Sequence, residues 1–284
     1  MMKSTIGWIG LGTMGVPMAN SLIRSGYNLS VFNRSPEKSQ TLQQQGATVS
    51  ESPAALIAKV DILIIMVTDD KAIKEIFQGQ NGLLSAQAKG KTIINMSTVS
   101  PAISIEMEAL CRLQGNHYLD APVSGSVKQA TEATLVIIAG GESEVFEEVK
   151  PILESIGKLA IHFGEVGAGN RVKLVVNTLL AIQAQALAEA LRFAEDLQVD
   201  KSALMEVLNN SALASPFIKI KGEAIVGGNF KPAFSLDNIV KDLKLAKEIG
   251  LAYPLGTTAL ESYTSAASAY GSEDIISIFN AIKS

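Results

Sequence analysis

Residues 5–15 read TIGWIGLGTMG, a short β-type run followed at once by three glycines in the spacing Gly-x-Gly-x-x-Gly. A helical pattern over residues 14–24 begins inside this motif, so the order is strand, glycine loop and helix. Gly10 allows a tight turn, Gly12 lets the backbone approach a ligand, and Gly15 lets the helix pack closely on the strand. The stretch predicts the first unit of a doubly wound α/β domain.

The same context predicts a dinucleotide site, because the N-terminus of a helix that follows such a loop attracts a pyrophosphate. The alternative is a glycine-rich turn that packs and binds nothing. The loop residues assigned to the cofactor are Gly10, Leu11, Gly12, Thr13, Met14 and Gly15.

The next strand, residues 28–32, ends at Asn33-Arg34-Ser35, where an acidic residue would accept hydrogen bonds from the ribose 2′-hydroxyl of NAD. These three positions hold no acidic residue. Arg34 offers a planar cation suited to a 2′-phosphate, with Asn33 and Ser35 beside it, so the sequence predicts NADP(H) as the cofactor. A solvated arginine before the following helix is the alternative.

Further β-type runs alternate with helical patterns and are expected to complete one sheet. They cover residues 61–67, 92–96, 117–121, 134–139 and 159–163. Residues just past the carboxyl ends of parallel strands line the ligand crevice of such a sheet. Ser97 and Thr98 are therefore candidates for the nicotinamide half of the site, and Met66 joins the cofactor set.

A loop of small residues, DAPVSGS at 120–126, lies between two of these strands. Free backbone amides in such a loop form a natural nest for a carboxylate. Pro and Gly turns also connect strands in most proteins, so an ordinary turn is the alternative.

From residue 164 onward strand signals nearly vanish and helical patterns follow. The predicted domains are 1–164, which holds the glycine loop, and 165–284, which is all-α. The longest helix, residues 167–196, is apolar on nearly every side and is expected to be buried. Lys173 and Asn177 lie one turn apart on one face of it. An ion pair with a core carboxylate, a helix end emerging into solvent and a functional lysine are the three explanations open at this point.

Composition excludes several function classes. The 284 residues carry a net charge of −4 without a basic stripe, which argues against a nucleic-acid or anionic-membrane partner and favours a small-molecule ligand. Cys111 is the only cysteine, and His117 and His162 lie apart, so disulfides, metal sites and hydrolytic triads are unsupported. The start has no charged leader and polar residues interrupt the longest helix, so a soluble, cytoplasmic protein is expected.

With these pieces in place, the sequence resembles the β-hydroxyacid dehydrogenase family along essentially its whole length. Four separated signatures match in order, which is far more specific than any single motif: GLGTMGVPMANSL at the start, DAPVSGS at 120–126, GAGNRVKLVVN at 167–177 and KDLKLA at 241–246. Asn33-Arg34-Ser35 and the SGS of the second signature make it similar to the glyoxylate and succinic semialdehyde reductase branch. The resemblance implies NADPH-dependent reduction of short aldehyde acids to hydroxy acids.

The resemblance also implies residue roles. Lys173 would be the catalytic lysine, with Asn177 beside it in the substrate pocket. Ser124 and Gly125 would hold the substrate carboxylate, and Thr98 and Lys241 would contact the cofactor. Phe234 and Asp242 would close the pocket from the second domain. Thr178 departs from the residue frequent at this position in the family, Asn or Met, which bears on substrate size.

Other functions stay open beside this one. An NAD-dependent 3-hydroxyisobutyrate dehydrogenase is disfavoured by Arg34, and an imine reductase of the same architecture typically lacks the lysine. A non-catalytic NADP-binding module is disfavoured by the joint presence of Lys173, Asn177 and the 120–126 loop. The apolar surface of helix 167–196 exceeds what one small α-domain needs, so a homodimer or homotetramer is expected to bury it.

Overall fold

The computed structural model describes residues 4–282 of the chain. Its contacts divide the chain into two compact units, Met1–Lys173 and Leu174–Ser284. The predicted boundary at residue 164 precedes this division, which falls inside the longest helix.

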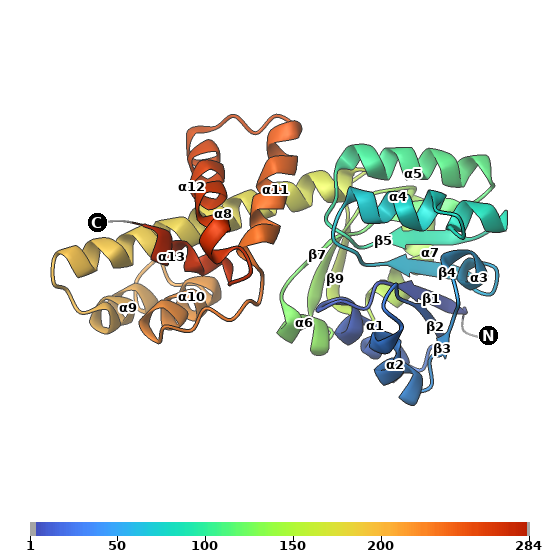
Figure 1. The fold of residues 1–284 in the computed structure, drawn as a ribbon, viewed down its shortest axis with the longest axis horizontal. Coiled ribbons are helices and arrows are strands. Elements are labelled where there is room, and N and C mark those ends of the chain that lie inside the picture. The colour runs from blue at the N-terminus through green and yellow to red at the C-terminus, as the bar shows by residue number, and fades with distance from the viewer. Residues whose placement is uncertain (1–3, 283–284) are drawn as a thin grey trace. The chain divides into compact units, whose positions relative to one another are not determined.

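Unit 1 is organised around a parallel six-stranded sheet, shown in Figure 1. Its strands run in the spatial order β3-β2-β1-β4-β5-β6. They are β1 (Ile6–Ile9), β2 (Leu29–Phe32), β3 (Thr48–Val49), β4 (Ile62–Ile65), β5 (Thr92–Asn95) and β6 (His117–Asp120). The order reverses between β1 and β4, so a ligand crevice is expected at the carboxyl ends of these two strands.

Helices cover both faces of this sheet because each strand alternates its side chains between two cores. Trp8 of β1 belongs to a cluster with Met18 and Leu22, whereas Ile9 belongs to a second cluster with Ile73. The helices of unit 1 are α1 (Gly15–Arg24), η1 (Pro36–Ser39), α2 (Gln40–Gln44), α3 (Pro53–Ile57), α4 (Asp70–Gln78), η2 (Leu83–Ala86), α5 (Pro101–Leu113), α6 (Val127–Thr131) and α7 (Ser143–Leu153). The predicted doubly wound fold is confirmed.

One prediction about the sheet is wrong. The strands expected at 134–139 and 159–163 are β8 (Leu135–Ala139) and β9 (Gly157–His162), and they do not extend the six-stranded sheet. They form a second, three-stranded sheet with the short β7 (Val123–Ser124), which pairs antiparallel with β8. β6 ends at Asp120, and Pro122, which has no amide hydrogen to donate, follows two residues later; its carbonyl accepts a hydrogen bond from the amide of Ile138.

The regular elements among the described residues of unit 2 are all helices, as the sequence predicts. α8 (Ala168–Asp196) crosses from unit 1 into unit 2. The helices after it are α9 (Lys201–Asn209), α10 (Pro216–Val226), α11 (Leu236–Glu248), α12 (Pro254–Tyr270), η3 (Ile275–Ser277) and α13 (Ile278–Ala281). Ala181, Ala184 and Leu191 of α8 pack into the same core as residues of α11 and α12.

The prediction that α8 is buried on every side is wrong for a single copy of the chain. Val175, Leu179 and Phe193 are 69%, 56% and 63% exposed. Because helical residues four and eighteen apart share a face, these side chains form one open apolar stripe along the helix. Of the described helices, α8 is also the one long and apolar enough to cross a bilayer, a test that core helices of soluble proteins pass as well.

Candidate active site

The register of the sheet brings the predicted cofactor residues to one edge. Ile9 of β1 lies opposite both Phe32 of β2 and Ile65 of β4. The strands therefore end at the same level, and the residues that follow them, Gly10, Asn33 and Met66, begin neighbouring loops.

Glycine suits each of the three positions of the loop for a different local reason. Gly10 has φ +98°, and a Cβ there would lie 2.0 Å from the carbonyl oxygen of Met66. A Cβ on Gly15 would lie 2.0 Å from the carbonyl oxygen of Gly10, so α1 packs as closely on β1 as backbones allow. A Cβ on Gly12 would meet nothing within 4 Å, which leaves open space beside that backbone. This space and the N-terminus of α1 fit a pyrophosphate.

Asn33 braces this loop. Its Oδ1 accepts a hydrogen bond from the amide of Leu11 at 2.8 Å, and its Nδ2 donates to the carbonyl of Ser35 at 2.9 Å. Arg34, between them, is exposed at the turn after β2. The geometry therefore ties the glycine loop to the turn that carries the predicted 2′-phosphate contact.

The loop after β5 separates the roles of its two hydroxyl residues. Ser97 is fully buried, and its hydroxyl accepts a hydrogen bond from the amide of Val67 at 2.9 Å, which links the ends of β4 and β5. Thr98 is half-buried. Of the two residues proposed from the sequence for the nicotinamide half, Thr98 is thus the one with exposed surface.

Asp120 is a buried carboxylate that begins the DAPVSGS motif but has no role predicted from the sequence. Its Oδ1 accepts from the amide of Gly167 at 2.7 Å, and its Oδ2 accepts from the amide of Asn170 at 2.7 Å. Burial raises the pKa of Asp120 to about 6, although these hydrogen bonds act in the opposite direction. The contacts join the end of β6 to the first turn of α8.

The loop after β6 carries the predicted carboxylate site. Ser124 is half-buried in β7, and Gly125 has φ +137°, a backbone conformation that favours glycine. Ser126 and Gln129 form a capping box that starts α6. Ser126 is therefore committed to the helix, and Ser124 and Gly125 are the residues of this loop assigned to the substrate.

The predicted catalytic pair lies on α8 with little exposure. Lys173 is 9% exposed and Asn177 is 2% exposed. Nδ2 of Asn177 donates a hydrogen bond to Oδ2 of Asp242 on α11 at 2.5 Å. The other carboxylate oxygen of Asp242 forms an ion pair with Nζ of Lys241 at 2.8 Å.

The resemblance places Asp242 at the substrate, which stays a prediction, and the structure shows the partners of its carboxylate within the protein. The residue is 2% exposed, and each of its oxygens faces a side chain of the protein. Because Asn177 donates its amide hydrogen to Asp242, its own Oδ1 is turned the other way as an acceptor. The hydrogen bond therefore fixes which way the amide of Asn177 faces.

Phe234 lies in a segment held by a third buried carboxylate, Asp274, which no sequence motif indicated. Asp274 accepts hydrogen bonds from the amides of Ala233 and Phe234 at 3.0 and 3.3 Å. It also pairs with Nζ of Lys221 at 2.6 Å, with the two side chains 4% and 11% exposed. Phe234 itself is half-buried.

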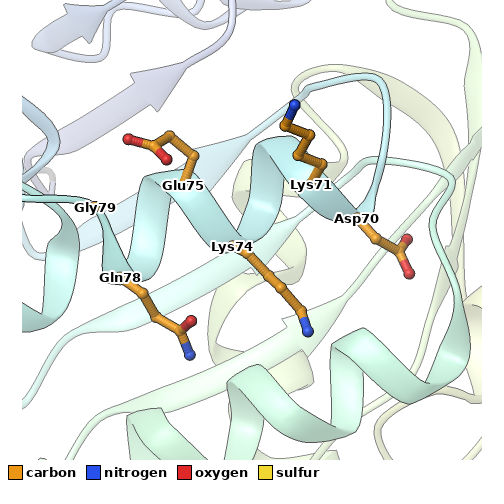
Figure 2. Close-up of a pocket in the computed structure, with 6 residues that line it drawn as sticks. All are labelled: Asp70, Lys71, Lys74, Glu75, Gln78 and Gly79. Atoms are coloured by element: carbon orange, nitrogen blue, oxygen red, sulfur yellow. The ribbon is translucent and has the colours of Figure 1, made fainter.

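Two shallow hollows lie on the surface of the described residues. One follows the outside of α4, where Asp70, Lys74 and Gln78 lie along one side and Lys71 and Glu75 along the other (Figure 2). None of the predicted site residues lines it. The other, between α11 and α12, includes Lys241. Among residues 4–282 no cluster of three or more His, Cys, Asp or Glu residues is placed to hold a metal ion.

Two family models match consecutive parts of the chain. Residues 5–167 match the NAD binding domain of 6-phosphogluconate dehydrogenase. Residues 167–282 match the model described as NAD-binding of NADP-dependent 3-hydroxyisobutyrate dehydrogenase. Together they cover both units.

Curated relatives and solved structures agree with these matches. Glyoxylate/succinic semialdehyde reductase 1 of Arabidopsis thaliana is 32% identical over 98% of each chain. The human cytokine-like nuclear factor N-PAC is 34% identical over 91% of this chain, which spans 47% of that protein.

Among solved structures, Mycobacterium tuberculosis 3-hydroxyisobutyrate dehydrogenase with L-serine is 30% identical, with a TM-score of 0.90 over the full length of both chains. Psf3 in complex with NADP⁺ and 2-OPP is 25% identical, with a TM-score of 0.91 over 98% of this chain and 100% of that one.

The glycine loop at the strand reversal, the lysine on the long helix and the matches over both units lead to one assignment. The chain belongs to the β-hydroxyacid dehydrogenase family of NAD(P)-dependent oxidoreductases, which act on CH–OH groups.

Proposed function

We propose that the protein is an NADPH-dependent reductase that converts short aldehyde acids, with glyoxylate and succinic semialdehyde as substrates, into hydroxy acids. The observation that carries the proposal is Lys173, a 9% exposed lysine in the same compact unit as the glycine loop and Ser124. A lysine ammonium can donate a hydrogen bond and then a proton to a carbonyl oxygen that is being reduced. The 32% identity to a glyoxylate/succinic semialdehyde reductase supports the substrate class.

NADP(H) is the proposed cofactor because of the turn after β2. Arg34 is exposed there, and the three residues Asn33-Arg34-Ser35 hold no carboxylate that would repel a 2′-phosphate. Asn33 holds this turn against the glycine loop through its bonds to Leu11 and Ser35. A phosphate in contact with Arg34 would therefore be held in a fixed relation to the pyrophosphate site.

The reaction needs a hydride on the carbonyl carbon and a proton on the carbonyl oxygen. When bound, the reduced nicotinamide supplies the hydride. Ser124 and the backbone at Gly125 hold the substrate carboxylate. Lys173 donates a hydrogen bond to the carbonyl oxygen and then a proton to the alkoxide that develops there, which completes the hydroxy acid. Asn177 presents its Oδ1 acceptor one helical turn further along the same face of α8.

The test is a panel of glyoxylate, succinic semialdehyde, methylmalonate semialdehyde and tartronate semialdehyde, each with NADPH and NADH. We expect oxidation of NADPH with the first two. Lys173→Ala should lower kcat by a factor on the order of 10² to 10⁴, the usual contribution of a general acid, and leave the Kd for NADPH unchanged. Lys74→Ala, which removes a 52% exposed lysine from α4, is the matched control. Near-normal rates in the Lys173 variant would disprove the role of this lysine.

Two other functions have a specific observation in their favour. A 3-hydroxyisobutyrate dehydrogenase is favoured by the TM-score of 0.90 to the M. tuberculosis enzyme, and it predicts NAD⁺-dependent oxidation of 3-hydroxyisobutyrate. A non-catalytic NADP-binding module is favoured by the similarity to a nuclear factor, and it predicts tight NADPH binding without turnover of any aldehyde. The same panel, run in both directions, separates the three functions.

A homodimer or homotetramer is proposed from the apolar stripe of Val175, Leu179 and Phe193 on α8. Monomeric soluble proteins seldom leave such a continuous stripe open to water. Leu179→Glu should dissociate the oligomer, as measured by light scattering. A monomeric mass for the wild-type protein would contradict the proposal.

A further inference from the structure

Two sequence motifs of unit 1 meet at one carboxylate. Asp120 lies four residues before Ser124, the proposed carboxylate contact of the substrate. It accepts hydrogen bonds of 2.7 Å from the amides of Gly167 and Asn170. Asn170 lies three residues before Lys173. A single buried side chain therefore connects the loop that holds one end of the substrate with the helix that carries the proton donor.

Asp120 acts as the missing N-cap of α8. Gly167 precedes the first helical residue and has φ +91°, which favours glycine, but glycine has no side-chain oxygen to cap the helix. Asp120 supplies two oxygens from a strand that ended 47 residues earlier. A carboxylate at this position forms charge-assisted hydrogen bonds and faces the positive end of the helix dipole.

The junction around Asp120 leaves little room for movement. A Cβ on Gly140 would lie 2.6 Å from Oδ1 of Asp120, and a Cβ on Gly169 would lie 2.5 Å from the carbonyl oxygen of Asp120. Asn170 adds a second connection, because its Oδ1 accepts a hydrogen bond from the amide of Val99 at 3.0 Å. The start of α8 is thus held against the ends of β5, β6 and β8.

We propose that Asp120 is a positioning residue that sets the separation between the carboxylate site at Ser124 and the ammonium of Lys173, and thereby the length of aldehyde acid that reacts well. The proposal rests on the proposed function. In glyoxylate the carboxylate carbon is bonded directly to the aldehyde carbon, so both groups must match the protein at once. Succinic semialdehyde has two methylenes between them, and their rotation compensates for a displaced lysine.

The test replaces Asp120 with Asn, which keeps the shape of the side chain but turns one acceptor into a donor. The amide of either Gly167 or Asn170 then loses its partner. We expect kcat/KM for glyoxylate to fall at least about tenfold more than kcat/KM for succinic semialdehyde. The reason is that a displacement near 1 Å lowers the rate of a reaction that needs rigid alignment by a factor on the order of 10². The Kd for NADPH should not change.

Asp200→Asn is the matched control. Asp200 caps α9 through a 2.8 Å bond to the amide of Ala203, and the same change there should leave the ratio of the two kcat/KM values intact. If Asp120→Asn does not fold, Asn170→Ser keeps both backbone bonds to Asp120 and removes the side-chain bonds of Asn170 to Val99, Ser104 and Asp120. It should shift the ratio in the same direction by a smaller factor.

Two outcomes are distinguishable. A ratio within twofold of the wild-type value in the folded variants would overturn the positioning role and leave the proposed function standing. A wild-type protein that reduces neither aldehyde would overturn the proposed function and the positioning role together.

Discussion

The hydrogen bond between Asn177 and Asp242 allows a direct test of what Asp242 does. Asp242→Ala removes the acceptor of Nδ2 of Asn177, whereas the amide oxygen of Asp242→Asn can take the place of the Oδ2 that accepts this bond. Asn177 is 2% exposed, so its amide lies away from bulk water. The two variants therefore separate an orienting carboxylate from one that contacts the substrate.

The expected change in the free energy of unfolding follows from the burial of these side chains. A buried amide left without its partner costs about 1–3 kcal/mol of unfolding free energy. The side chain of Lys241 is 26% exposed, so loss of its ion pair adds about 1 kcal/mol at most. We expect Asp242→Ala to lower the free energy of unfolding by about 2 kcal/mol and Asp242→Asn by less than about 1 kcal/mol. Because the amide of Asn177 can then rotate, kcat should fall roughly tenfold in the alanine variant only.

The assay combines urea unfolding followed by circular dichroism with kcat and KM for glyoxylate. An Asp242 that contacted the substrate would repel its carboxylate, so Asp242→Asn would then lower KM while kcat stayed the same. Equal losses of kcat in both variants, or such a fall in KM, would refute the orienting role.

Three further predictions concern other parts of the chain. Arg34→Leu should shift the ratio of kcat/KM values for NADPH and NADH toward NADH, and an unchanged ratio would mean that Arg34 does not contact the 2′-phosphate. Asp274→Asn should lower the free energy of unfolding by about 3 kcal/mol, because it leaves Lys221 buried without a counter-ion. Glu106→Gln, in an exposed ion pair, should lower it by less than about 1 kcal/mol, and calorimetry of the two variants measures the difference. Asp120 has a folded-state pKa of about 6, above its unfolded value near 3.8, so the folded state binds more protons between these values. Stability from this group should therefore fall by roughly 3 kcal/mol in total as pH rises from about 3 to about 7 and then level off, and Asp120→Asn should abolish this slope in urea unfolding.

Much of unit 1 could be predicted from local sequence. The glycine spacing at 10–15 requires a tight turn and a close helix, and the apolar runs of β1 and β4 are typical of strands covered on both faces. Lys173 and Asn177 share a face because of helical periodicity alone. These features depend on neighbours within a few residues, so the order of residues determines them.

The remaining features depend on contacts between residues far apart in the chain. No periodicity indicates that β8 pairs with β7 rather than with β6. The apolar pattern of α8 does not distinguish a core face from an open stripe, because both kinds of face consist of apolar residues. The partners of Asp120 and Asp242 lie 47 and 65 residues away along the chain, and only the folded backbone brings those donors within hydrogen-bond distance of a carboxylate.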